Sequence, residues 1–309
     1  MNSKTLLYIL KRLLLAALTV LIVITITFFV AHAAPGDPFA SEKGKTAEQI
    51  LALKEKHGMT GTLFEQYTNY LEKAVLRFDL GYSIKKEGYT VVDRISNGME
   101  TSLKIGLIAA GCALVAGIIL GSVAALRRNK ILDKTIMVIT TAFVSMPSFI
   151  VGTLLLYIFS QLLGWVPANT DQQGGLILPI ITLALYPAAY ITRLTRSSML
   201  DVLGQDYIRT ARAKGVSGPK IIFGHALKNS LLPVITYMGP MIAYIVTGSL
   251  VVERIFAVPG IGREFVTCIQ NRDYPVIMGT TIVLAVLIVI MNLVSDILYK
   301  IVDPRITLE

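Results

Sequence analysis

The amino-acid sequence predicts an all-α polytopic membrane protein with a small helical subdomain outside the bilayer. Hydrophobic residues make up 54% of the 309 residues, and the mean hydropathy is +0.65. Only 16% of the residues are charged, whereas soluble proteins carry about 25%. The apolar residues also gather in long uncharged runs, which soluble domains rarely contain. Composition therefore excludes a disordered chain and disfavours an ordinary soluble domain.

Six runs are long and apolar enough to be membrane spans. They cover residues 13–34, 105–126, 135–163, 176–191, 231–252 and 276–295. The first run is about 22 residues long, or roughly 33 Å of helix, so we expect a retained anchor rather than a cleaved signal peptide. Three runs contain prolines, which membrane helices tolerate where neighbouring groups satisfy the freed backbone. Kinked helices around a cavity are therefore expected.

The long connection after the first run is expected to fold as a small subdomain. Thr46 with Gln49, and Thr62 with Glu65, have the spacing of capping boxes, which begin helices. Apolar residues recur at helical spacing after the second box. We therefore expect two short helices here, and two domains: 1–95, the first span with its external subdomain, and 96–309, a five-span core whose 192–230 connection faces the cytoplasm.

The positions of Lys and Arg predict the orientation in the membrane. If the N-terminus is inside, sixteen bases lie in the inner segments, against none in 164–175 and three in 253–275. Because short cytoplasmic loops are enriched in Lys and Arg, both termini are expected in the cytoplasm of a multi-pass plasma-membrane protein. The net charge of +9 then reflects bases along the inner membrane surface and lipid, and no nucleic-acid partner is needed.

The sequence contains no pattern typical of an enzyme. Gly44-Lys45-Thr46 lacks the earlier glycine of a phosphate-binding loop, because that position is Phe39. The three histidines and two cysteines lack the spacing of a metal site. The charged residues nearest the spans, Lys104 and Asp296, lie at span edges. An ion-coupled carrier would need charged residues deeper in the membrane. We therefore expect no catalytic residue, no bound metal and no cofactor on this chain.

The 192–230 connection has the pattern of a docking surface. Asp206 is a predicted N-cap, Gly215 a predicted residue just beyond a helix C-terminus, and Pro219 a first-turn residue of the next helix. Ala211, between these positions, would let another backbone approach closely. Arg and Lys side chains beside it could meet acidic groups. Composition alone favours a basic loop that only follows the positive-inside rule.

The residues of this connection resemble the EAA loop of bacterial ABC-importer permeases, in which Glu-Ala-Ala, Gly and Ile-x-Leu-Pro recur at fixed spacing. Ala211, Gly215 and Leu227 fit that pattern, whereas Arg209, Thr210, His225 and Lys228 depart from it. The peptide and nickel branch of the family is the most similar. Five further segments resemble that branch in the same order: 34–38 (Ala-Pro-Gly-Asp-Pro), 79–83 (Asp-Leu-Gly-Tyr-Ser), 258–262 (Val-Pro-Gly-Ile-Gly), 271–275 (Asn-Arg-Asp-Tyr-Pro) and 303–305 (Asp-Pro-Arg).

The resemblance implies a six-helix permease of the type I ABC-importer architecture that works by alternating access. Its expected partners are a second homologous permease subunit, two ATPase subunits that bind ATP and Mg²⁺, and an extracytoplasmic substrate-binding protein. The residues expected to couple to an ATPase subunit are Tyr207, Arg209, Thr210, Ala211, Arg212, Ala213, Gly215, His225 and Leu227. Those expected at an outer gate or a binding-protein contact are Pro259, Gly260, Gly262, Asp273 and Tyr274.

Three functions remain open from the sequence. The first is import of oligopeptides or dipeptides, with nickel uptake as its rival within the same family. The second is an ion-coupled secondary carrier, which would transport without an ATPase. The third is a membrane scaffold for which the basic connection is only an assembly site. Co-purification of an ATPase subunit would separate the first function from the other two.

Overall fold

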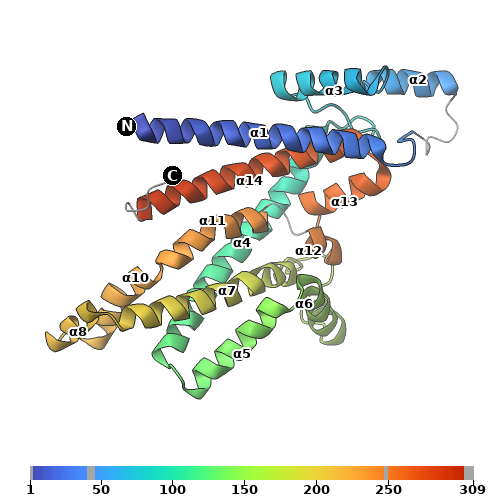
Figure 1. Cartoon of the computed structure of the whole chain (residues 1–309). Coiled ribbons are helices and arrows are strands. Elements are labelled where there is room, and N and C mark those ends of the chain that lie inside the picture. The colour runs from blue at the N-terminus through green and yellow to red at the C-terminus, as the bar shows by residue number, and fades with distance from the viewer. Residues whose placement is uncertain (1–2, 40–45, 247–249, 303–309) are drawn as a thin grey trace. The chain divides into compact units, whose positions relative to one another are not determined.

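The computed structural model describes residues 3–39, 46–246 and 250–302, and these residues are almost entirely helical (Figure 1). An isolated bridge between Tyr82 and Thr90 is the one β-type pairing within these ranges. The long helices are apolar along most of their length. The predicted all-α membrane fold is therefore confirmed.

The described residues form seventeen helical elements, three of which (η1 to η3) are π-helical. In chain order they are α1 (Ser3–Ala33), α2 (Ala47–Lys56), α3 (Leu63–Leu71), η1 (Glu72–Leu76), α4 (Val91–Leu126), α5 (Ile131–Ser145), α6 (Ser148–Leu155), η2 (Leu156–Leu162), α7 (Ile177–Leu203), α8 (Asp206–Ala213), α9 (Gly218–Lys220), η3 (Ile221–Ala226), α10 (Leu227–Ser230), α11 (Leu232–Val246), α12 (Leu250–Ile255), α13 (Ile261–Asn271) and α14 (Tyr274–Val302).

The helices contain most of the predicted spans, with different boundaries. Within the described residues, four helices are long and apolar enough to cross a membrane, or five if α5 and the α6–η2 helix make one bent span. Leu232–Ile245 is a shorter apolar helix, and residues 247–249 of the predicted fifth span lie outside the described residues. The helix α4 begins at Val91, well before the predicted span at 105. Residues 91–104 are therefore helical although they lie outside the apolar run.

The predicted 135–163 span is sharply bent. Its two halves, Ile131–Ser145 and Ser148–Leu162, meet at 108°. Pro147 explains the break, because proline disfavours helical geometry in the residue before it, and Met146 is indeed extended, with φ −84° and ψ 128°. The expectation of proline-kinked helices is confirmed here, and Pro187 and Pro240 lie inside α7 and α11.

The chain divides into two compact units, and each is described by itself. Unit 1 comprises Met1–Ser102 and Pro259–Val289, and unit 2 comprises Leu103–Val258 and Ile290–Glu309. The core of unit 1 contains residues of α4, α13 and α14, namely Val91, Ile95, Ile261, Cys268 and Val276. Close approach supports this core, since a Cβ at Gly279 would lie 2.3 Å from the Val91 side chain.

The predicted external subdomain lies in unit 1 and begins its two helices as expected. Thr46 and Thr62 each accept a hydrogen bond from the backbone N–H three residues later, and Gln49 and Glu65 bond back to the caps. Both predicted capping boxes are confirmed. The second helix packs on α1, since Tyr67 is 2.7 Å from the Thr25 hydroxyl and its ring lies 5.4 Å from that of Phe28.

Unit 2 is built around α7, which packs against α4, α5, α6 and α11. Its contact with α4 is tight because Gly117 and Gly121 carry no side chain. A Cβ at Gly117 would lie 2.6 Å from the Ile191 side chain of α7. A Cβ at Gly121 would lie 2.6 Å from atoms of Thr192 and Thr195 on the same helix. Small residues four apart let membrane helices approach closely. The part of unit 2 around Gly117 and Gly121 is therefore densely packed.

Candidate functional site

The predicted coupling residues lie on the connection between α7 and α11, residues 204–231, called here the α7–α11 connection. Its first helix, α8, begins at Asp206 with Gln205 as the N-cap, and no side chain caps it. The prediction that Asp206 is the N-cap is therefore wrong by one residue. Gln205 takes the extended conformation of a cap, with φ −72° and ψ 150°, and Asp206 instead contributes a negative charge to the first turn, where the helix dipole favours it.

The helix α8 is fixed to unit 2 by one face only. Ile208 is fully buried. It belongs to a core made of residues from α4, α7, α8 and η3, namely Ala125, Met199, Ile208, Ile221 and Ala226. Burying one such apolar side chain contributes about 1.5–3 kcal/mol. The other faces of α8 are left for solvent or a partner.

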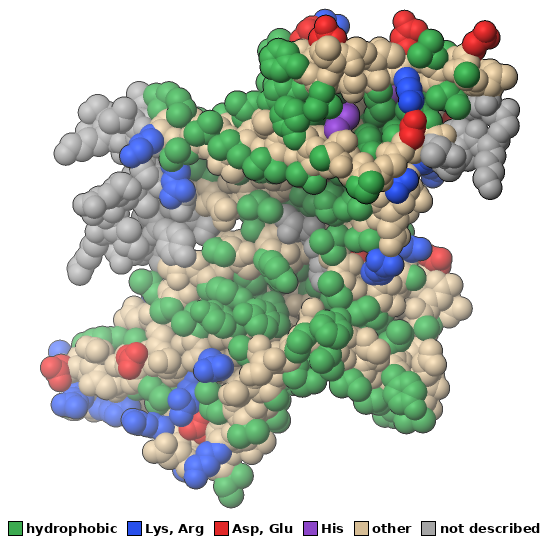
Figure 2. All heavy atoms as spheres, turned by 45° about the vertical axis from the view of Figure 1, so that its right-hand side comes forward, with side chains coloured by type: hydrophobic (Ala, Val, Ile, Leu, Met, Phe, Trp, Pro, Cys, Tyr) green, Lys and Arg blue, Asp and Glu red, His purple; other side chains and the backbone are tan. Residues whose placement is uncertain are grey.

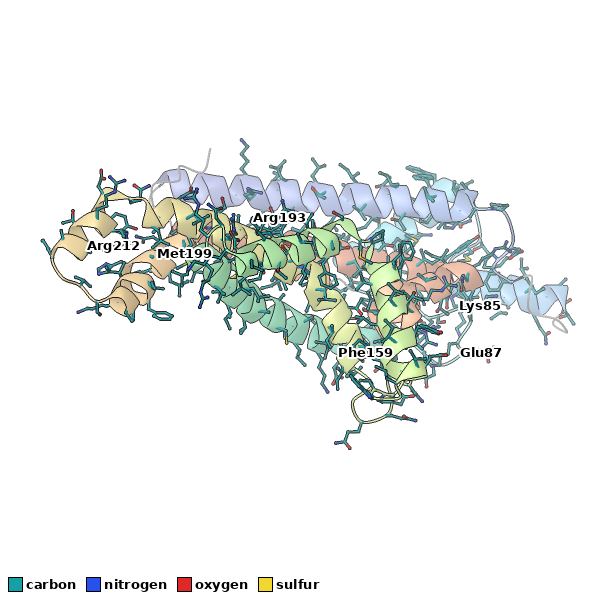
Figure 3. All side chains as sticks on the ribbon, turned by 90° about the horizontal axis from the view of Figure 1, so that it is seen from below. Lys85, Glu87, Phe159, Arg193, Met199 and Arg212 are labelled. Atoms are coloured by element: carbon teal, nitrogen blue, oxygen red, sulfur yellow. The ribbon has the colours of Figure 1, made fainter. Side chains whose placement is uncertain are left out.

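Most of the nine predicted coupling residues are exposed. Ala211 and Leu227 are half-buried, and the others are exposed: Tyr207, Arg209, Thr210, Arg212, Ala213, Gly215 and His225. Figure 2 shows Lys and Arg side chains gathered at this end of unit 2. In Figure 3, Arg212 lies at the opposite end of unit 2 from Phe159 of η2.

The chain reverses after α8 through Gly215. Its φ is +77°, and the N–H groups of Gly215 and Val216 donate to the carbonyls of Arg212 and Ala211 at 3.0 and 3.1 Å. This is a Schellman motif, in which glycine is favoured because it carries no Cβ. The predicted role of Gly215 at the helix end is confirmed. Pro219 lies in the first turn of α9, also as predicted.

A hydrogen bond joins the two arms of the connection. The Asn229 side-chain amide donates to the Tyr207 hydroxyl at 2.8 Å, so α8 is tied to α10 beside the predicted residues His225 and Leu227. The Arg209–Asp206 pair is different, because its atoms are 3.6 Å apart and both side chains are largely exposed. Exposed pairs of this kind contribute little to stability.

A buried ion pair supports this end of unit 2. Arg196 of α7 donates to the Asp133 carboxylate of α5 through Nε at 2.6 Å and through Nη2 at 2.8 Å. The Asn129 N–H also donates to this carboxylate, at 2.9 Å. The Asp133 side chain is only 3% exposed. Sequence reasoning missed this pair, because the two residues are 63 positions apart and neither belongs to a recognisable motif.

The predicted outer residues lie in unit 1, around a group of four side chains called here the Asp273 cluster: Ser83, Arg94, Glu264 and Asp273. Asp273 is fully buried. It accepts hydrogen bonds from the Ser83 hydroxyl and from the Ile84 N–H, the latter at 3.0 Å. Arg94 lies 3.5 Å from the same carboxylate and forms an ion pair with Glu264. Two segments 190 residues apart are thereby joined.

The neighbouring predicted residues pack tightly around the same cluster. Gly260 and Gly262 are buried, whereas Pro259 is exposed. A Cβ on Gly98 of α4 would lie 2.9 Å from the Ile261 nitrogen, and that nitrogen donates to the Ser102 hydroxyl at 2.9 Å. The turn before α13 is therefore held against α4.

Tyr274 ties in a further segment. Its hydroxyl donates to the Gly36 carbonyl at 3.3 Å, and a Cβ on Gly36 would overlap the Arg272 guanidinium. The segments around residues 36, 83, 260 and 273 thus meet in unit 1. The sequence identified these segments one by one but did not predict that they meet. Their shared Gly and Pro turn residues were the one signal that could have linked them.

The electrostatics of this region favour an inert interior. Burial raises the pKa of the Cys268 thiol to about 12, and the nearby Asp273 and Glu264 carboxylates act in the same direction. A thiol with such a pKa is neither a nucleophile nor a metal ligand near neutral pH. The cluster therefore holds chain segments together and has no arrangement suited to catalysis.

The chain was compared with known proteins. Residues 117–308 match the family described as the binding-protein-dependent transport system inner membrane component, and residues 5–88 match the N-terminal family of the same membrane components. The Bacillus subtilis dipeptide transport system permease protein DppB is 45% identical over 98% of each chain. The Haemophilus influenzae oligopeptide transport system permease protein OppB is 41% identical over 97% of this chain and 98% of that one.

Solved structures agree on the fold. A chain of the MetNI methionine ABC transporter in an inward-facing conformation superimposes with a TM-score of 0.56 at 17% identity, covering 69% of this chain and 97% of that one. An amino acid ABC transporter crystallised with histidines gives the same score at 12% identity, covering 68% of this chain and 94% of that one. The predicted type I ABC-importer permease fold is confirmed.

These matches also decide between the three functions that the sequence left open. A permease of an ABC importer agrees with the relatives and the solved structures named above, whereas a secondary carrier or a scaffold agrees with none of them. Because a family match covers 117–308 and full-length relatives reach 45% identity, the chain belongs to the binding-protein-dependent transport system inner membrane component family.

Proposed function

We propose that this permease carries dipeptides or oligopeptides across the membrane as one subunit of an ATP-driven importer. The observation that carries the proposal is the similarity to a dipeptide permease along 98% of both chains at 45% identity. A similarity of that extent includes the helices that surround a pathway as well as the docking connection. Transport of the same class of substrate is therefore the simplest expectation.

The α7–α11 connection is proposed to dock on an ATPase subunit. The helix α8 is anchored through Ile208 and presents Arg209, Arg212 and the small residue Ala213 to solvent. Small exposed residues allow a close approach by another backbone, and the guanidinium groups can pair with carboxylates or carbonyls of a groove. ATP and Mg²⁺ would bind to the ATPase subunits, with no cofactor or metal on this chain.

The bundle behind α8 is suited to transmit motion. The Asp133–Arg196 pair and the contacts of Gly117 and Gly121 hold α4, α5 and α7 together at this end, while the prolines of α7 and α11 weaken the helices further along. Closure of two ATPase subunits would push α8, and this end would move as a rigid body. The permease would thereby alternate between inward-facing and outward-facing states.

The remaining partners follow from the family. A second homologous permease would complete the pathway, and an extracytoplasmic binding protein would deliver the substrate to the opposite side. The distribution of Lys and Arg supports cytoplasmic termini, and α8 would then lie in the cytoplasm and the Asp273 cluster outside. Because Asp273 and Tyr274 are buried, contact with the binding protein would fall to exposed neighbours such as Pro259.

The test is to purify the tagged chain from its own host in mild detergent, identify every co-eluting protein, and reconstitute the complex into liposomes with its binding protein. The proposal expects two ATPase subunits, a second permease, and ATP-dependent uptake of a labelled dipeptide or tripeptide. Uptake by the chain alone under a proton or sodium gradient would overturn it. So would ATP-dependent uptake of Ni²⁺ with none of either peptide.

A further inference from the structure

Unit 2 contains a cavity of about 570 Å³ where three proline-containing helical segments meet. Its walls come from the α5–α6 bend, the middle of α7 and the middle of α11. Pro147 at the α5–α6 break lines it, and so do Pro187 and Pro240, which lie inside α7 and α11. The volume lies within the range of about 300–1,000 Å³ that is common for small-ligand sites.

The chemistry of the walls is neutral. None of the cavity's lining residues is Asp, Glu, Lys, Arg or His. Polar groups are supplied by the hydroxyls of Tyr186, Tyr237 and Tyr244 and of three smaller residues, while the remaining surface is mostly apolar. A tyrosine hydroxyl can both donate and accept a hydrogen bond. The cavity can therefore satisfy a neutral group that has both a donor and an acceptor.

We propose that this cavity binds the backbone of a peptide in transit. A peptide bond presents one N–H donor and one C=O acceptor whatever its side chains are, and the tyrosine hydroxyls match that pair. Neutral walls neither select nor reject a particular side-chain charge. The inference rests on the proposed function and deepens it, since it names the part of the substrate that is read.

The same walls fit a metal cation poorly. A Ni²⁺ ion prefers imidazole, carboxylate or thiolate ligands, and the lining supplies none of them. An extended peptide instead gains from an apolar surface together with a few hydroxyls. The composition of the cavity thus favours peptide over nickel within this family.

The structure also supplies a matched control. Tyr190 lies one helical turn after Tyr186 on α7, and its ring contacts that of Tyr237 at a tilt of 36°, with 4.4 Å between centroids. Tyr190 does not line the cavity. A Tyr190→Phe variant therefore removes a hydroxyl beside the proposed site without changing the lining.

The experiment uses the reconstituted transporter with its binding protein and ATPase subunits, and measures uptake of labelled tri-alanine and of Ala-Lys-Ala and Ala-Glu-Ala. In the Tyr186→Phe and Tyr237→Phe double variant, we expect uptake to fall about tenfold, since each net hydrogen bond is worth a few-fold in equilibrium. The factor should be equal for the three peptides. The Tyr190→Phe variant should transport normally.

A second measurement does not depend on transport rates. With p-azidophenylalanine in place of Tyr186, illumination in the presence of labelled tri-alanine should attach the peptide to this chain, and excess unlabelled peptide should prevent it. The inference would be overturned if the residue at position 186 cross-linked only to lipid or to the second permease and never to the peptide. Unchanged uptake by the double variant would also overturn it. If the wild-type transporter takes up none of the peptides and the p-azidophenylalanine variant cross-links none, the proposed function itself fails, and the two failures are thereby distinguished.

Discussion

The α7–α11 connection presents most of its motif residues to solvent, whereas the Asp273 cluster and its neighbours bury most of theirs. Arg209, Arg212 and Gly215 are exposed, and the helix α8 buries a single side chain, that of Ile208. Asp273 and Tyr274, by contrast, are buried and bonded to segments far away in the sequence. Both regions resemble family motifs, so resemblance alone does not reveal which residues touch a partner.

The comparison indicates that a motif residue can be needed for one of two reasons, contact with a partner or stability of the fold. Exposed residues with small or charged side chains are available to another subunit. Buried polar residues that satisfy one another are costly to change because a lost partner leaves a buried charge. We therefore expect substitutions in the connection to impair coupling, and substitutions in the cluster to impair folding of unit 1.

The largest effect is expected for Asp273→Ala. Removing this carboxylate leaves Arg94 without one of its buried partners, and breaking a buried pair costs about 3–5 kcal/mol. The measurement is the alkylation rate of Cys268 by a maleimide in a Cys112→Ser background. Wild-type Cys268 should stay unreactive, because it is buried and its pKa is raised to about 12, whereas the variant should react.

The control for that prediction is Asp206→Ala, which removes a carboxylate that is 95% exposed and should leave the alkylation of Cys268 unchanged. If Asp273→Ala keeps Cys268 protected and only weakens association with the binding protein, Asp273 acts as a contact residue. The contrast between the two regions would then be lost.

The second effect is expected for Gly215→Trp, compared with Gly88→Trp. Both glycines have positive φ, +77° and +84°, and neither would place a Cβ within 4 Å of another atom. Both variants therefore place a side chain on a similarly left-handed backbone, and only the one on the connection would meet a docked ATPase. Uptake should fall at least about tenfold in Gly215→Trp, with ATP hydrolysis retained, and remain near wild type in Gly88→Trp. Equal losses in both would mean that strain alone explains the effect.

Local features were predicted well from the sequence. The capping boxes at Thr46 and Thr62 depend on residues three positions apart, and the Gly215 turn depends on one residue without a Cβ. The Asp206 cap was displaced by one residue, because an acidic residue is favoured in the first turn of a helix as well as at its N-cap.

The long-range features were not predictable in the same way. The Asp133–Arg196 pair and the Ser83–Asp273 bond join residues 63 and 190 positions apart, and only the packing of helices brings them together. Gly117 and Gly121 did carry a signal, since two glycines four apart in an apolar run are typical of close helix contacts. The proline positions indicated kinks but not the 108° angle at Pro147.

A smaller effect is expected for Asn229→Ala, which removes the hydrogen bond to the Tyr207 hydroxyl. A net hydrogen bond contributes about 0.5–1.5 kcal/mol, so the ratio of peptide imported to ATP hydrolysed should fall a few-fold. Tyr207→Phe removes the same bond from the other side, and the double variant should be no worse than either single one. Additive losses would show that Tyr207 or Asn229 also contacts the ATPase, which would sharpen the proposed docking surface.

The smallest effect concerns pH and His57 in unit 1. Burial lowers the pKa of His57 below 6.5, and the charge of Lys56 acts in the same direction, against the opposing charge of Asp273. The folded state therefore binds the proton less well than the unfolded state, so the contribution of His57 to stability is complete above pH 6.5 and is lost as the pH falls through the lowered pKa. Thermal unfolding of the purified complex at about pH 7.5 and about pH 5.5 should show a larger decrease for wild type than for His57→Gln, because glutamine does not titrate. An identical decrease in both would mean that His57 is solvated in unit 1. His57 would then not belong to the interior of buried polar groups that distinguishes unit 1 from the exposed connection.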